Sequence, residues 1–213
     1  MAKFLPKWVY IWTRDVHLYA GLFLSPFVVL FAVSAVFLNH NWRPGPVEPA
    51  AVERTVSGLR IPEGLERSEG MDRVQKVRLL LPQLGVTGEV SYINYDAGRR
   101  HMVAPVQRAG KNTTIDLDFT NASARLKERT TGVWDGLVFL HKMPGPHLVA
   151  IRKNWPVVRL WAYLADATVY LTFLLSATGI YLWLVLKAER RAGLILAGAG
   201  VLSFCVVIYG LYS

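Results

Sequence analysis

Three long apolar stretches divide the chain, and each is long enough to form a helix that crosses a membrane. They cover residues 18–38, 167–186 and 192–212, and a less apolar helical extension precedes the second from about residue 157. A hydrocarbon core about 30 Å thick needs about 20 helical residues. The pattern predicts a membrane α-helical protein with three transmembrane helices. The first stretch is too long for a signal-peptide core, so we interpret it as a retained signal anchor.

The region between the first two apolar stretches has the pattern of a small soluble α+β domain. Apolar residues recur at helical spacing over residues 71–81, and later segments alternate between apolar and polar residues. Strands are predicted over residues 89–95, 99–107 and 112–119, with turns at residues 96–98 and 108–111. We therefore expect one helix packed on a small antiparallel sheet.

These patterns divide the chain into three parts. Residues 1–40 hold the N-terminus and the first transmembrane helix, residues 41–156 hold the soluble domain, and residues 157–213 hold the last two helices. A linker rich in proline and glycine is expected over residues 43–62, and a connection back to the membrane over residues 131–146.

Six basic residues lie in the short flanks that decide the orientation of the apolar stretches. They lie before the first stretch and between the second and third: Lys3, Lys7, Arg14, Lys187, Arg190 and Arg191. The positive-inside rule places both groups in the cytoplasm, so the soluble domain and the C-terminus are predicted on the opposite side. This bias and a mildly basic outer domain account for the net charge of +9. No nucleic-acid-binding motif accompanies the charge, and we expect no nucleic acid partner.

Cysteine and glycine usage adds two restraints. The single cysteine, Cys205, excludes an internal disulfide or a CxxC site. The last apolar stretch carries small residues, including Gly193 and Ala197, whose spacing permits close helix packing within the protein or against a partner. An oligomer through this third helix is one arrangement that the spacing allows.

Three short motifs resemble one known family. They are VHLYAGL at residues 16–22, LVFLHK at residues 137–142 and SATGIYLW at residues 176–183. With the order of the predicted elements, they resemble the PepSY-associated transmembrane family of bacterial membrane proteins. The predicted helix and strands between them look like a single PepSY domain. The resemblance covers roughly residues 10–191, and this chain looks like a shortened, three-helix member.

The resemblance implies both a location and a chemistry. It implies a bacterial inner-membrane protein with a PepSY-like periplasmic domain between helices one and two. Larger relatives of this type include haem-containing reductases of ferric siderophores, and the likeness favours His17 as a haem ligand. It also suggests, more weakly, a regulator of periplasmic proteases.

The chain has five histidines: His17, His40, His101, His141 and His147. Neutral imidazole is a common ligand of haem iron, and ionisable residues at membrane boundaries are functional candidates. His17 and His40 bracket the first helix, about 35 Å apart if the helix is continuous, so they cannot ligate the same haem. His101 lies on a strand beside two arginines and is expected to be a solvated surface residue.

Three histidines are expected on the outer side, where His40 and His141 form the leading pair of axial ligands for haem b. His147 follows a rigid Pro-Gly-Pro turn and could replace either. The alternative is that these imidazoles only anchor helix ends at the headgroups or hydrogen-bond loop carbonyls. A haem on His17 would need a methionine, a tyrosine, a partner chain or an open sixth position.

Two functions follow as hypotheses. The first is a b-type haem electron-transfer protein of the inner membrane, linked to periplasmic ferric iron or siderophore reduction and working with a membrane or periplasmic redox partner. The second is a non-catalytic accessory or scaffold subunit of a larger membrane complex, whose periplasmic domain binds protein. The residues leave open whether the chain is itself an enzyme; if it is, we expect a membrane oxidoreductase.

Overall fold

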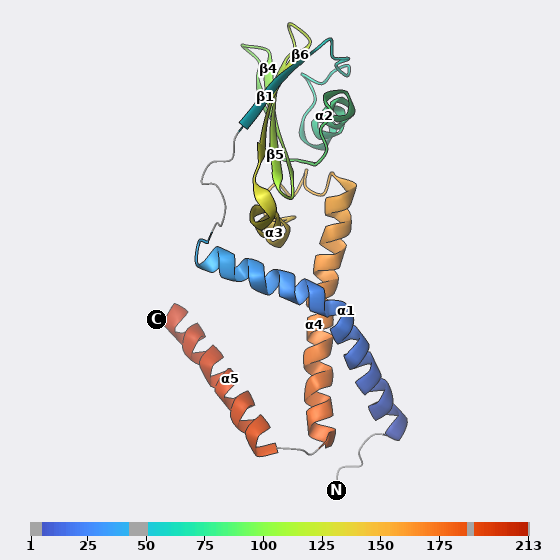
Figure 1. Ribbon diagram of the computed structural model, residues 1–213, viewed down its shortest axis with the longest axis vertical. Coiled ribbons are helices and arrows are strands. Elements are labelled where there is room, and N and C mark those ends of the chain that lie inside the picture. Colours follow the sequence, from blue (N-terminus) through green and yellow to red (C-terminus); the bar gives the residue numbers. More distant parts are fainter. Residues whose placement is uncertain (1–5, 43–50, 187–189, 213) are drawn as a thin grey trace. The chain divides into compact units, whose positions relative to one another are not determined.

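The structure is a computed structural model that describes residues 6–42, 51–186 and 190–212 (Figure 1). The chain divides into two compact units. One unit holds residues 1–26 and 167–213, and the other holds residues 27–166. The basic residues Lys3 and Lys187, on which the predicted orientation partly rests, lie outside the described residues.

Three helices are long and apolar enough to cross a membrane, as the sequence predicts: α1 (Lys7–Asn39), α4 (Pro156–Leu186) and α5 (Arg190–Tyr212). Helix α1 begins eleven residues before the apolar stretch, and it includes Arg14 and Asp15, which pair with each other at 2.8 Å. In α1 the proline at position 26 lies at the boundary between the two units.

The first unit is built from parts of α1, α4 and all of α5. Close approach of α1 and α4 is marked at Gly21, where an added Cβ would lie 3.9 Å from Leu175. Helix α5 meets α4 at Gly193, where a Cβ would lie 2.3 Å from the indole of Trp183. A side chain at position 193 would therefore push the two helices apart.

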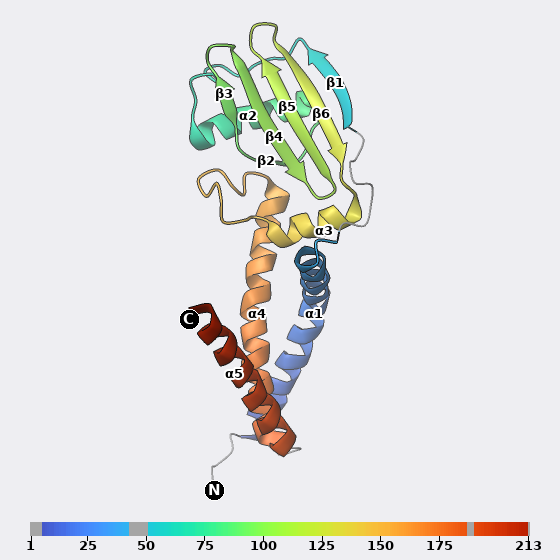
Figure 2. The ribbon, with the colours of Figure 1, turned by 90° about the vertical axis from the view of Figure 1, so that its left-hand side faces the viewer.

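The second unit contains a six-stranded antiparallel sheet of order β1-β6-β5-β4-β2, with β3 also paired to β4. The strands are β1 (Ala51–Ser57), β2 (Glu89–Val90), β3 (Asn94–Asp96), β4 (His101–Arg108), β5 (Lys111–Asp118) and β6 (Ser123–Thr130). Figure 2 shows the sheet face-on with α2 (Gly70–Leu84) behind it. The core lies between them and includes Val74, Leu80, Met102 and Leu117.

The predicted helix and the last two predicted strands are confirmed, but the sheet is larger than expected. Strand β1 lies inside the predicted linker, and β6 was not predicted. Both strands carry charged residues on solvent-exposed positions, and β6 buries only Ala124 and Leu126. Their apolar alternation is therefore too weak to distinguish them from loops.

The single strand predicted over residues 89–95 is instead two strands. Paired residue numbers sum to 196 along β2 and to 197 along β3, so one extra residue lies between them, as in a β-bulge. Ser91 donates its N–H to the carbonyl of Pro105, which has no N–H to return. The proline interrupts the ladder at the point where the register shifts.

A further helix, α3 (Gly132–Lys142), occupies most of the segment expected to be a simple connection. It packs closely against the turn between β4 and β5, where a Cβ on Gly136 would lie 3.3 Å from the nitrogen of Gly110. Trp134 lies against Phe37 of α1, with ring centroids 4.6 Å apart. Helix α3 therefore lies between the sheet and the end of α1.

Candidate functional site

His17 forms a polar contact between α1 and α4. Its Nδ1 lies 2.7 Å from Thr178 Oγ1, and the Thr178 hydroxyl lies 2.7 Å from the carbonyl oxygen of Leu174. A Cβ on Gly179 would lie 3.4 Å from His17 Cε1, so the glycine leaves room for the imidazole ring. Two of the motif residues, Thr178 and Gly179, therefore form the side of α4 that receives His17.

The contact between His17 and Thr178 lies some way before the C-terminal end of α4. From the sequence, His17 is expected at a membrane surface. Thr178 lies eight residues before Leu186, the last residue of α4, which is about 12 Å along a helix axis. The imidazole therefore lies beside an apolar part of α4 rather than beside its end.

His141 on α3 forms a second contact of the same kind. Its Nδ1 lies 2.7 Å from Ser34 Oγ of α1, and the Ser34 hydroxyl lies 3.0 Å from the carbonyl oxygen of Phe31. The ring of Phe31 meets the imidazole edge-on at 5.4 Å. Ser34 is fully buried, with 0% of its surface exposed. Nearby, Trp161 of α4 donates its indole N–H to the carbonyl of Leu140 at 2.9 Å.

The two contacts suit the same neutral tautomer in both histidines. A hydroxyl has one hydrogen to donate, and both Thr178 and Ser34 lie within hydrogen-bond distance of a backbone carbonyl that can accept it. When the hydroxyl donates there, its oxygen accepts from Nδ1–H of a neutral imidazole, whose Nε2 then has a lone pair. Metal-ligating histidines have their second nitrogen held in this way.

The other two candidate histidines lie in different surroundings. His40 is exposed just after α1, and its ring lies 5.3 Å from that of Trp42. His40 follows the last residue of α1, six residues after Ser34. His147 is exposed and lines a cavity of about 230 Å³ beside β2. Within the described residues, neither ring contacts His141.

The residues fit haem b only in part. The donor chemistry of His17 and His141 suits one axial ligand each, because Nε2 is available in the neutral tautomer that carries its hydrogen on Nδ1. A pair of facing imidazoles, as predicted for His40 and His141, is not assembled in the described part of the chain. Among the described residues, no histidine lines a cavity of about 350 Å³ in the sheet domain, and His147 is the histidine that lines a second one of about 230 Å³.

The sheet domain is joined to the start of α4 by a buried polar cluster. Asn154 pairs with both backbone groups of Val90, accepting its N–H at 3.1 Å and donating to its carbonyl at 2.7 Å. The carboxylate of Glu89, only 4% exposed, accepts the N–H groups of Asn154 and Trp155 at 3.0 and 2.6 Å. Burial raises the pKa of Glu89, against the lowering effect of these hydrogen bonds. No sequence motif indicates this cluster.

Within residues 6–42, 51–186 and 190–212, no group of three or more histidine, cysteine, aspartate or glutamate side chains is arranged to hold a metal ion. His101 lies between Asp116 and Asp118, at 3.2 and 3.8 Å, on the sheet face away from α2. It is half-exposed, in keeping with its expected place on the surface.

No family model, curated protein or solved structure matches the chain. The fold nevertheless defines a class: a protein with three helices of membrane-spanning length and one antiparallel sheet domain between the first two. The resemblance to the PepSY-associated transmembrane family stays a prediction.

Proposed function

We propose that the chain is a haem b-binding electron-transfer protein of a bacterial inner membrane, with the sheet domain in the periplasm. In this proposal, His17 and His141 each supply one axial ligand to a separate haem. One observation supports this most: each imidazole is held at Nδ1 by a hydroxyl, which leaves Nε2 available as a ligand atom. A periplasmic ferric iron species is the proposed electron acceptor.

The protein's own residues have three tasks in this proposal. Thr178 and Ser34 orient the imidazoles and suit the tautomer that can ligate through Nε2. Phe31 and the apolar faces of α1 and α4 keep water away from His141 and His17. His40 or His147 is the predicted second ligand beside His141, and a partner chain or another side chain is needed beside His17. Bound haem would supply reversible one-electron transfer.

The test is a dithionite-reduced minus oxidised absorption spectrum of the purified protein, with a haem-to-protein ratio. His17→Ala and His141→Ala are each expected to remove the haem of their own site. Thr178→Val and Ser34→Ala should keep haem but shift its midpoint potential, because the imidazole loses its hydrogen-bond acceptor. His101→Ala is the matched control and should change nothing. Full haem content in both alanine variants at positions 17 and 141 would refute the proposal.

A second function is favoured by the surface of α5. Every described residue of this helix except Gly193 is exposed, including Phe204 and Tyr209. Such a helix faces either lipid or another protein, so an accessory subunit that docks through α5 is the alternative. It predicts a colourless protein that co-purifies with a stable partner, and Gly198→Leu on the exposed face should release that partner. Isolation of a lone colourless monomer would contradict it.

A further inference from the structure

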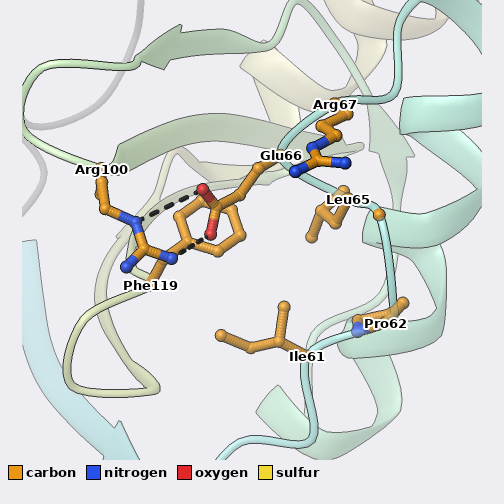
Figure 3. A pocket seen from close by; sticks show the side chains of 8 residues that line it. Ile61, Pro62, Leu65, Glu66, Arg67, Arg100 and Phe119 are labelled. Carbon is orange, nitrogen blue, oxygen red and sulfur yellow. Dashed lines mark hydrogen bonds and ion pairs between the residues drawn. The ribbon is translucent and has the colours of Figure 1, made fainter.

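The sheet domain contains a preformed cavity that the proposed electron-transfer function does not use. It has a volume of about 350 Å³ and lies where the segment over residues 61–67 meets the start of β4 and the end of β5. Its lining is Ile61, Pro62, Gly64, Leu65, Glu66, Arg67, Arg100 and Phe119. Figure 3 shows Arg100 and Phe119 on one side, with Leu65, Arg67, Pro62 and Ile61 around the other.

The apolar part of this cavity is fixed by packing. Leu65 is 1% exposed and Phe119 is 8% exposed, and both belong to the domain core. The ring of Tyr95 meets that of Phe119 edge-on at 5.7 Å. The buried Ser68 hydroxyl donates to the carbonyl of Leu65 at 2.7 Å, which holds the turn in place. The cavity therefore needs little reorganisation to accept an apolar group.

The acidic group at the cavity is already neutralised. Glu66 accepts two hydrogen bonds from Arg100, at 2.5 and 3.4 Å, and one from the hydroxyl of Tyr95 at 2.9 Å. The guanidinium of Arg73 lies over the Tyr95 ring, 5.7 Å from its centre. A cationic ligand would therefore have to compete with Arg100 for Glu66, the only carboxylate among the described residues that line the cavity.

Arg67 is the charged side chain at the cavity whose hydrogen-bond donors are not used by the described residues, although its charge helps to lower the pKa of Glu66. Its guanidinium forms no hydrogen bond or ion pair with any residue that the structure describes, and the residue is exposed. With Glu66 balanced by Arg100, the lining carries a net charge of +1 from Arg67. Arginine binds carboxylates through two parallel hydrogen bonds, which suits an anionic end group.

We propose that this cavity binds a carboxylate attached to an apolar body, with the body against Ile61, Leu65 and Phe119 and the carboxylate on Arg67. A cavity of about 350 Å³ is within the range of small-molecule sites, which starts near 300 Å³. Either a small free acid or the carboxyl end of a peptide with an apolar last residue has this chemistry. This proposal is independent of haem binding.

The experiment uses the full chain in lipid nanodiscs and titrates it with 4-phenylbutyrate, followed by calorimetry or NMR. The uncharged control ligand is 4-phenylbutanol, which has the same body. A ligand of about 12 heavy atoms is expected to bind near the millimolar range. Two peptides that end in phenylalanine, one with a free and one with an amidated carboxyl end, distinguish the two sources of the carboxylate.

Three variants test the assignment of charge. Arg67→Gln should weaken 4-phenylbutyrate binding at least roughly tenfold, through loss of the charge-assisted pair. Glu66→Gln should strengthen it, because Arg100 is then free to bind the ligand. Arg99→Gln, next to the cavity but paired with Asp96, is the matched control and should bind as the wild type does. Thermal unfolding of each variant verifies that the domain is folded.

Equal binding of the acid and the alcohol would overturn the proposal, since the cavity would then recognise only the apolar body. Equal binding by the Arg67→Gln and Arg99→Gln variants would overturn it as well. Binding of the free peptide but not of 4-phenylbutyrate would support it and identify a chain end as the ligand. Haem content should be unchanged in all three variants, so failure here and failure of the electron-transfer proposal are separate results.

Discussion

The helices and the sheet domain hold their polar side chains in different ways. Between helices, His17 and His141 each pair with a neutral hydroxyl. In the sheet domain, Glu66 and Glu128 pair with arginine or lysine. A neutral pair avoids the cost of burying charge in apolar surroundings, whereas an exposed charge pair remains hydrated. The histidines of the helices are therefore held by neutral partners, whereas these glutamates of the sheet domain are held by charged ones.

The largest expected effect lies at the joint between the domain and α4. Asn154→Ala would leave both backbone groups of Val90 without a partner in a buried setting. Each such group costs about 1–3 kcal/mol, so we expect the free energy of unfolding of the domain to fall by about 2–4 kcal/mol. Denaturant unfolding followed by far-UV circular dichroism measures this. Asn121→Ala, which removes an exposed side chain, is the control and should cost far less.

A loss of less than about 1 kcal/mol in Asn154→Ala would show that water replaces the amide. The hydrogen bonds of Asn154 would then contribute no more to stability than the exposed ion pairs of the sheet do.

The next effect tests the neutral pairs between helices. Thr178→Val keeps the shape of the side chain but leaves His17 Nδ1–H without an acceptor. Hydrogen bonds between membrane helices are worth about 0.6–2 kcal/mol, and we expect a loss of stability in that range. Unfolding in mixed micelles measures it. Ser176→Ala is the control, because Ser176 donates only to a carbonyl of its own helix.

If Thr178→Val and Ser176→Ala unfold alike, the contact between His17 and Thr178 contributes no stability. The neutral pairs between the helices would then not stabilise the protein, and the proposed difference from the sheet domain would not hold.

Comparison of the predicted and observed elements shows which structural features a local sequence pattern can predict. The three long helices and α2 were predicted because many apolar residues repeat with one period, as Val74, Val77 and Leu81 do. Strand β6 was missed because only Ala124 and Leu126 are buried. The histidines are predicted from residue type and Thr178 lies in a quoted motif, but neither its contact with His17 nor that of Ser34 with His141 is predicted. Their role depends on which residues of distant helices meet, and no local pattern contains that information.

The predicted pair of haem ligands, His40 and His141, stays a prediction. The two were grouped because both lie next to a helix on the same predicted side. The structure shows in addition that His141 contacts Ser34 of α1, a contact that a position next to a helix end does not indicate.

A smaller effect concerns pH and Glu89. Its pKa is raised above the usual 4.5 because the carboxylate is buried. The native state then binds the proton more tightly than the unfolded state, so this residue's contribution to stability declines as pH rises from about 4.5 through the native pKa. In Glu89→Gln this decline should be absent. Melting temperatures of both proteins between pH 4 and pH 8 provide the comparison, and parallel profiles would contradict the assignment.

The smallest effect is expected at the exposed pair of Glu66 and Arg100. Its contribution to stability changes with pH in the opposite direction to that of Glu89. Arg100 lowers the pKa of Glu66 below 4.5, with Tyr95 adding to the effect. The pair therefore contributes its stability above about pH 4.5 and loses it as pH falls through the native pKa. Glu66→Gln should melt at a slightly lower temperature than the wild type at pH 7 and at no lower temperature at pH 3.

High salt should shrink the difference in melting temperature at pH 7, because exposed pairs are screened, whereas it should leave the Thr178→Val effect unchanged. A salt-independent difference for Glu66→Gln would mean that this exposed pair behaves like the buried neutral ones.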